Sequence, residues 1–192
     1  MNKIRLLTAS LALLCNTSFA GTIQNGNFAT GDLSGWDHTS RVSVVSNGTG
    51  EYAAKLIAGL GKGIYTTLSQ HIYLNAGDTL NGWAQWIGMD YMPYNDLGFV
   101  TIGTTPLFEA SISKYGNYQS SSVVNFSFTA ATSDWYTLSA GVADIKDPQL
   151  HSELNVGGFT FPSSNVPEPG SLALLGVGLV ALAMRRRTHQ RR

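Results

Sequence analysis

The chain has 192 residues, of which 43% are hydrophobic and 12% charged, and this length and apolar content suit one packed domain with short appendages. The formal net charge of zero hides a segregation, because residues 21–166 hold 11 acidic and five basic side chains while the other basic residues gather at the two ends. Nucleic-acid binding depends on Lys and Arg side chains that displace counterions from phosphates. The acidic middle of the chain therefore argues against nucleic acid as a partner.

The first 20 residues have the pattern of a signal peptide. A basic start is followed by an apolar run at residues 6–14, and then by Ser18 and Ala20 at the small-residue spacing that signal peptidase accepts. We expect signal peptidase to cleave after Ala20. Lipidation of Cys15 is the alternative, and the bulky Leu14 in front of it argues against that modification.

Residues 21–162 alternate in short runs that Gly, Asn, Asp and Ser interrupt, and no segment keeps a helical period for three turns. Apolar residues fall on every second position at 42 and 44, 72 and 74, 100 and 102, 124 to 128, and 136 to 142. Such positions share one face of a strand. Roughly eight to ten strands fit this length, which is typical of an all-β jelly-roll β-sandwich. We expect Phe126 on the buried face of a central strand.

Aromatic residues supply the candidate ligand contacts. Trp83 and Trp86 are an odd number of positions apart, so on a regular strand they point to opposite faces and at least one belongs to the core. Tyr91 and Tyr94 lie beside Pro93 in a loop, where we expect both rings to be exposed. Because the apolar face of a sugar stacks on an aromatic plane, Tyr91 and Tyr94 are candidate glycan-binding residues.

The loop that contains these tyrosines, DYMPYND, also brings Asp90, Asn95 and Asp96 close together in the sequence. Carboxylate and amide oxygens suit calcium, so the three are candidate ligands of a structural calcium ion. A solvated turn made of common turn-forming residues is the alternative. A third interpretation makes Asp90 and Asp96 the acid and base of a glycosidase.

No other pattern in the sequence supports catalysis or a cofactor. His38, His71 and His151 lack metal-ligand spacing, and the serines include no Gly-x-Ser-x-Gly elbow. Glycines at 59, 61 and 63 lack the following helix that a phosphate-binding loop requires. We therefore expect a protein that is not an enzyme and that uses no cofactor apart from the candidate calcium ion.

Residues 163–192 differ in composition from the body of the chain. A linker is followed by an apolar segment at 171–184 and a basic cluster at 185–192. The linker contains the sequence Pro167, Glu168 and Pro169, and the cluster begins with Arg185, Arg186 and Arg187. A helix of about 14 residues rises roughly 21 Å against a hydrocarbon core of about 30 Å, so it is short for a stable membrane span. Arginines behind such a helix stay in the cytoplasm, which leaves the body outside.

This order of Pro-Glu-Pro, apolar segment and arginines resembles the PEP-CTERM sorting signal of Gram-negative bacteria. The resemblance implies that an exosortase, a membrane-embedded cysteine transpeptidase, recognises the tail and cuts near Pro-Glu-Pro. It also implies transient anchoring in the inner membrane through the C-terminal helix. The processed protein would then reside at the cell surface or in the extracellular matrix.

The body resembles the galactose-binding-like jelly rolls that include many carbohydrate-binding modules. The matching segments are NGNFATGDLSGW at 25–36, similar to their N-terminal strand, and LSQHIYLNAGDTLNGWAQW at 68–86, similar to a strand pair. In those modules a Glu that commonly helps to hold a structural calcium follows the Phe, whereas this chain has Ala29. The resemblance implies a binder of extracellular polysaccharide. A secreted glycan-active hydrolase on the same scaffold and a purely structural matrix protein are the alternatives.

Overall fold

The computed structural model describes residues 22–46 and 50–161. The expected signal peptide at 1–20, the linker, the Pro-Glu-Pro motif, the apolar segment and the arginine cluster lie outside the described residues. Within the described residues no helix is both long enough and apolar enough to cross a membrane.

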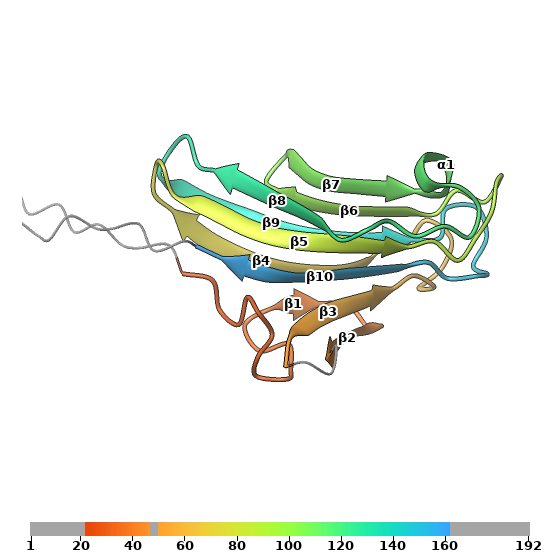
Figure 1. The fold of residues 1–192 in the computed structure, drawn as a ribbon, viewed down its shortest axis with the longest axis horizontal. Coiled ribbons are helices and arrows are strands. Elements are labelled where there is room, and N and C mark those ends of the chain that lie inside the picture. The colour runs from red at the N-terminus through yellow and green to blue at the C-terminus, as the bar shows by residue number, and fades with distance from the viewer. Residues whose placement is uncertain (1–21, 47–49, 162–192) are drawn as a thin grey trace, which may run out of the picture.

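Two antiparallel sheets of five strands form the body (Figure 1). In spatial order, sheet A contains β1 (Asp37–His38), β4 (Thr66–Leu74), β9 (Asp134–Ala143), β6 (Leu97–Ile102) and β7 (Thr105–Ser111). Sheet B contains β2 (Val42–Ser46), β3 (Tyr52–Ile57), β10 (Glu153–Thr160), β5 (Thr79–Ile87) and β8 (Val124–Thr129). One short helix, α1 (Ile112–Tyr115), follows β7.

The strand order is that of a jelly roll, which confirms the expected fold class. The strands from β3 to β10 lie in the order β3-β10-β5-β8 in sheet B and β4-β9-β6-β7 in sheet A. β2 extends one edge of sheet B, and β1 extends one edge of sheet A. The segment at 68–86 forms two strands as expected, but β4 and β5 belong to different sheets. Residues 25–36 form a series of turns and reach a strand only at Asp37, so the expected N-terminal strand is wrong.

Alternation along the strands builds the core between the sheets. On β5, Leu80, Ala84 and Trp86 are fully buried, and the register places Leu154 of β10 beside Trp86. The expectation that Phe126 belongs to a central strand is wrong, because β8 is the outer strand of sheet B. Its ring still packs on the core, with its centroid 6.2 Å from that of Phe159, but remains partly exposed.

One end of the sandwich gathers connections that are distant in the sequence. We call it the loop end: it consists of residues 58–65, 88–96 and 144–152, which join β3 to β4, β5 to β6 and β9 to β10, together with α1 (Figure 1, right). The last strand, β10, starts at this end and runs toward the opposite one (Figure 1). The end of β10, at Thr160, therefore lies at the end of the body away from the loop end.

Candidate functional site

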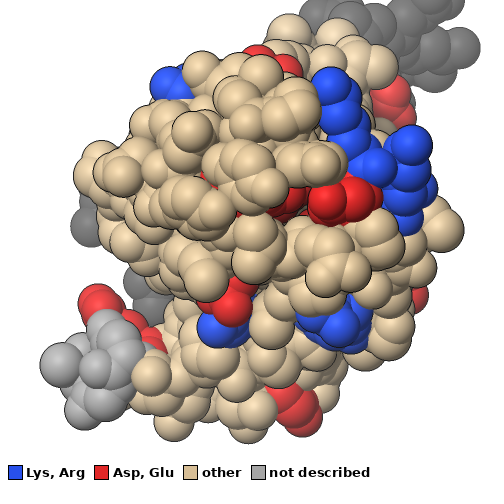
Figure 2. Space-filling model, turned by 90° about the vertical axis from the view of Figure 1, so that its right-hand side faces the viewer, with Lys and Arg blue, Asp and Glu red and all other residues tan. Residues whose placement is uncertain are grey.

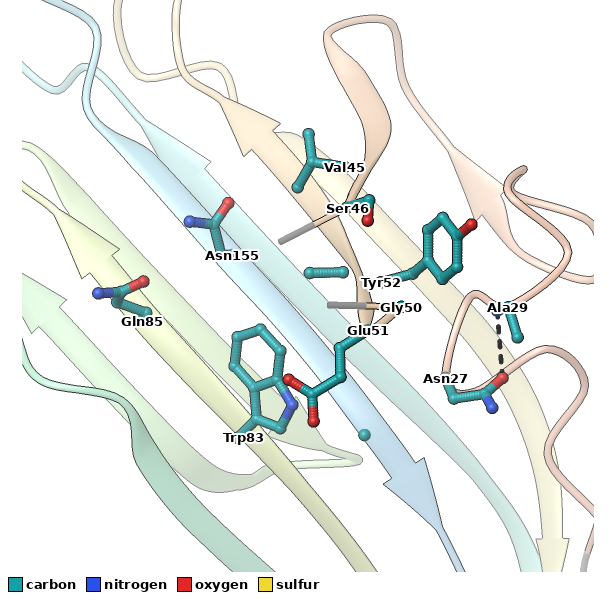
Figure 3. A pocket seen from close by; sticks show the side chains of 12 residues that line it. Asn27, Ala29, Val45, Ser46, Gly50, Glu51, Tyr52, Trp83, Gln85 and Asn155 are labelled. Atoms are coloured by element: carbon teal, nitrogen blue, oxygen red, sulfur yellow. Dashed lines mark hydrogen bonds between the residues drawn. The ribbon is translucent and has the colours of Figure 1, made fainter. Parts of the chain in front are cut away.

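A hollow on the outer face of sheet B is the first candidate site. It has a volume of about 350 Å³, and its lining includes Asn27, Glu51, Tyr52, Trp83, Gln85 and Asn155. We call it the sheet B groove (Figure 3). These residues come from the N-terminal turns and from β3, β5 and β10 with the turn before β3, so segments far apart in the sequence form one surface.

Trp83 lies against the backbone of β10 because two consecutive glycines leave room for it. A Cβ atom on Gly157 would stand 3.0 Å from Cζ2 of the indole, and one on Gly158 would stand 2.7 Å from Cδ1. Gly158 also has a φ of +62°, at an irregularity in the β5–β10 pairing, and L side chains rarely adopt this backbone conformation. The indole thus rests on bare backbone and lines the groove, while Trp86 fills the core.

Amide side chains lie beside the indole. Gln85 and Asn155 are directly paired in the β5–β10 register and so share the outer face of the sheet. The Oδ1 atom of Asn155 is buried and has no hydrogen-bond partner among the residues that the structure describes. A buried acceptor without a partner costs free energy, so a hydroxyl group that donated to it would be favoured. An aromatic plane next to amide donors and acceptors matches the two faces of a sugar ring, one apolar and one hydroxylated.

Tyrosines at the loop end form a second candidate site. Tyr91 is 36% exposed, and its ring centroid lies 5.3 Å from that of Tyr94, with the two rings nearly perpendicular at 81°. Tyr118 is more exposed, at 56%, and its ring packs on that of Tyr91 with the two centroids 5.7 Å apart. The expected exposure therefore holds for Tyr91, while Tyr94 is half-buried. Sequence reasoning did not join Tyr118 to this pair.

The connections of the loop end also hold buried carboxyl groups. Asp90 and Asp96 are each 1% exposed, and Asp144, from the β9–β10 connection, is fully buried near them. Acidic side chains are visible in a hollow near the middle of this end of the molecule, beside basic ones (Figure 2). Asn95 takes a different role, because its Oδ1 accepts a hydrogen bond of 2.7 Å from the backbone N–H of Ser113 at the start of α1.

Each carboxylate has one oxygen bound by the protein. Oδ1 of Asp90 accepts from the N–H of Tyr91 at 2.7 Å, and Oδ2 of Asp96 accepts from the Ser152 hydroxyl at 2.6 Å. Oδ2 of Asp144 lies 2.7 Å from Nδ1 of His151. Burial raises the pKa of Asp96 to about 7, and it raises the pKa of Asp90 and of Asp144 above the usual range.

His38, His71 and His151 each have a different hydrogen-bond partner and do not form a cluster. His151 pairs with Asp144, Nδ1 of His71 lies 3.2 Å from the Thr137 hydroxyl on sheet A, and Nδ1 of His38 lies 2.9 Å from the carbonyl of Thr39. Over residues 22–46 and 50–161, no three His, Cys, Asp or Glu side chains stand as a ready-made ligand set for a metal ion.

The tail of the chain matches a known sorting signal. The PEP-CTERM protein-sorting motif matches residues 165–187, which include Pro-Glu-Pro, the apolar segment and the first three arginines of the basic cluster. The expected sorting motif is thus confirmed. It indicates an exported protein that an exosortase processes in a Gram-negative bacterium. No curated protein matches the sequence.

Solved structures with a similar fold include two carbohydrate-binding modules. TmCBM61, in complex with β-1,4-galactotriose, is 16% identical with a TM-score of 0.46, and the match covers 74% of this chain and 97% of that one. The family 16 carbohydrate binding module-2 is 15% identical with a TM-score of 0.45, covering 73% and 99%. The K3 cleaved adhesin domain of Lys-gingipain from Porphyromonas gingivalis w83 is 11% identical with a TM-score of 0.48, covering 74% and 99%.

Proposed function

We propose that this exported protein is a non-catalytic polysaccharide binder of the cell envelope or extracellular matrix, and that sugar residues bind in the sheet B groove. The observation that carries the proposal is the position of Trp83 against the two glycines of β10, where its ring lines the groove. Its indole rests on Gly157 and Gly158 and is available to the groove, with the amide groups of Gln85 and Asn155 on the same face.

The chemistry of the groove favours a neutral glycan. The apolar face of a hexose stacks on Trp83, and ring hydroxyls exchange hydrogen bonds with Gln85 and with the buried Oδ1 of Asn155. The body carries more acidic than basic side chains, which repels polysaccharides rich in carboxylate or sulfate groups. Glu51 belongs to the same lining and adds to this preference.

The tail fits a role outside the cell. The predicted signal peptide directs export, with signal peptidase as the proposed partner that removes residues 1–20, and an exosortase then processes the tail. The groove lies on the outer face of sheet B, so the proposed ligand is a polysaccharide that the exported protein meets outside the cell.

The test compares two tryptophans. The full chain, purified in a mild detergent, is titrated with polysaccharide extracted from its own host, and binding is measured by affinity electrophoresis. We expect Trp83→Ala to weaken binding by about tenfold, since loss of an aromatic stacking partner costs on the order of 1.4 kcal/mol. Trp135→Ala is the matched control, because Trp135 is 66% exposed on sheet A and lies outside the groove.

Three results would contradict the proposal. Equal binding by the wild-type chain and by Trp83→Ala, with Trp135→Ala also unchanged, would remove the groove as the glycan site. Release of new reducing ends from the polysaccharide by the wild-type chain would favour the hydrolase alternative. An absence of binding to any host polysaccharide would leave the structural matrix protein.

A further inference from the structure

Exposed apolar side chains gather at the loop end. Within the described residues, the exposed large hydrophobic side chains outside this end are Val123 and Trp135. The others lie on connections that are separate in the sequence, and we call them the apolar patch: Ile64, Met89, Tyr91, Met92 and Leu150, with Tyr118 packed on Tyr91. Exposed apolar patches of this kind mark surfaces that interact with a partner.

Hydrogen bonds join the three connections into one surface. The β3–β4 connection is bonded to the β9–β10 connection, because the N–H of Gly63 donates to the carbonyl of Asp144 at 2.6 Å. The β5–β6 connection is bonded to the same neighbour through the N–H of Met89, which donates to the Ser152 hydroxyl at 3.1 Å. The apolar side chains of the three connections therefore share one end of the molecule and belong to one patch.

The fully exposed charges of the same end are basic. Lys62, Lys114 and Lys146 are exposed on the β3–β4 connection, on α1 and on the β9–β10 connection. The carboxyl groups of these segments are buried, apart from Asp147, which is half-buried. Figure 2 shows this end of the molecule, where basic side chains lie beside a mainly uncharged surface. A body with an excess of acidic residues thus presents exposed lysines beside the apolar patch.

We propose that the loop end binds the surface of a lipid bilayer that carries anionic headgroups. The aliphatic side chains of Ile64, Met92 and Leu150 enter the boundary between headgroups and acyl chains. The rings of Tyr91 and Tyr118 suit this boundary, because each has an apolar body and a polar tip. The lysines lay their alkyl stems along the apolar surface and hold their ammonium groups among the anionic headgroups.

This combination of side chains favours a bilayer over a protein partner. Protein interfaces are depleted in lysine, whereas three lysines are exposed around this patch. A second copy docked through the same patch would bring the lysines of both copies together, and like charges across an interface are unfavourable. The loop end is also separate from the outer face of sheet B, so lipid binding goes beyond the glycan binding proposed for the groove.

The experiment measures the surroundings of the loop end in the absence of glycan. The full chain with Cys15→Ser carries one new cysteine for a fluorophore: Gln149→Cys beside Leu150, or His71→Cys on the outer face of sheet A as the reference position. Each labelled chain is reconstituted into phosphatidylcholine vesicles with or without about 30% phosphatidylglycerol. Nitroxide-labelled lipid quenches a fluorophore that touches the bilayer. Because both labelled chains have the same tail, the difference between the two positions reports the loop end.

We expect quenching at position 149 and little at position 71 in the vesicles with phosphatidylglycerol. At least half of the quenching at position 149 should be lost in phosphatidylcholine alone. It should also be lost when the salt concentration rises from about 0.1 M to about 1 M, because the Debye length shortens from about 10 Å to about 3 Å.

Matched variants separate the two parts of the surface. Joint Ile64→Asp and Met92→Asp should reduce the quenching at position 149 to the level of position 71, because carboxylates stay in water. Joint Lys62→Glu and Lys146→Glu should abolish the preference for phosphatidylglycerol. Trp135→Asp is the control and should change neither result, because Trp135 is exposed at the start of β9, away from the loop end. All five positions are exposed, and an unchanged Tm verifies that each variant is folded.

Three results would overturn the proposal. The first is equal quenching at positions 149 and 71, and the second is equal quenching with and without phosphatidylglycerol. The third is an absence of quenching together with label emission that changes with protein concentration, which would assign the patch to a second copy of the chain. Glycan binding is measured separately with Trp83→Ala, so failure of one proposal leaves the other standing.

Discussion

The sheet B groove and the loop end are built in different ways. The groove stands on paired strands, where the pleat fixes which side chains point outward and where two glycines make room for an indole. The loop end is built from three connections and a short helix, and its acidic groups come from positions more than 40 residues apart, as Asp96 and Asp144 illustrate. The first region is held by the regular backbone of the sheet, whereas the second contains buried carboxyl groups whose pKa values are raised by burial.

The largest effect we expect separates the two tryptophans of β5. Trp86 is fully buried, and a Cβ atom on Gly98 would stand 2.8 Å from its Cζ3 atom, so the core is shaped around this ring. Trp86→Ala should lower the free energy of unfolding by about 3–5 kcal/mol, because it leaves a cavity. Trp83→Ala should lower it by less than about 1 kcal/mol, since the ring is only half-buried on the outer face of sheet B. Urea denaturation measures both.

This pair of variants tests whether the alternation of side chains along β5 places the tryptophan needed for stability on one face and the tryptophan needed for binding on the other. If Trp83→Ala destabilised the chain as much as Trp86→Ala, Trp83 would be a structural residue and the groove would lose its main ligand contact. If Trp86→Ala weakened glycan binding while remaining folded, the two faces of β5 would be coupled.

Much of the fold could be predicted from local patterns. Period-two alternation at 72 and 74, at 100 and 102 and at 136 to 142 identified β4, β6 and β9, and the odd spacing of Trp83 and Trp86 correctly predicted one core tryptophan. The position of a strand within its sheet could not be predicted, because pairing partners are distant in the sequence. Phe126 illustrates this: the alternation around it correctly predicted that its side chain faces the core, but it could not predict that β8 is the outer strand of sheet B.

The sites were less accessible to sequence reasoning, for two physical reasons. Asp144 could not be joined to Asp90 and Asp96 without knowing that the β5–β6 and β9–β10 connections meet at one end. The seat of Trp83 depends on Gly157 and Gly158, and only the β5–β10 pairing brings them under the indole. The one available signal was the consecutive glycines in an otherwise alternating strand, which mark close approach of another group to the backbone.

A smaller effect concerns the pH dependence of the loop end. Because burial raises the pKa of Asp96 from 3.8 to about 7, the folded protein keeps a proton at this group that the unfolded chain releases over this range. The contribution of this group to stability therefore falls as the pH rises from about 4 to about 7. Asp96→Asn removes this titrating group, so its Tm should exceed that of the wild-type chain at about pH 8 and lose the advantage near pH 4.

Asp32 supplies a control of opposite sign. Hydrogen bonds from Thr30 and Ser34 lower the pKa of Asp32, so its contribution to stability is present above the unfolded value of 3.8 and is lost as the pH falls through the folded value. Asp32→Asn should reduce the Tm at about pH 8 and converge with the wild-type chain in acid. Parallel Tm curves for the wild-type chain and Asp96→Asn across the whole range would show that Asp96 does not titrate differently on folding.

The smallest effect we expect is that of the tyrosines at the loop end. Tyr91 and Tyr94 meet edge to face, and Tyr118 packs on Tyr91, so the rings cover one another, whereas Trp83 has an indole face along the groove. Joint replacement of Tyr91 and Tyr94 by Ala should weaken binding of the host polysaccharide by less than about tenfold, because edge contacts with a sugar bury little area. The Tm should change by no more than about 2 °C, since Tyr91 is exposed and Tyr94 only half-buried. A loss as large as that of Trp83→Ala, with the Tm unchanged, would move the principal glycan site to the loop end.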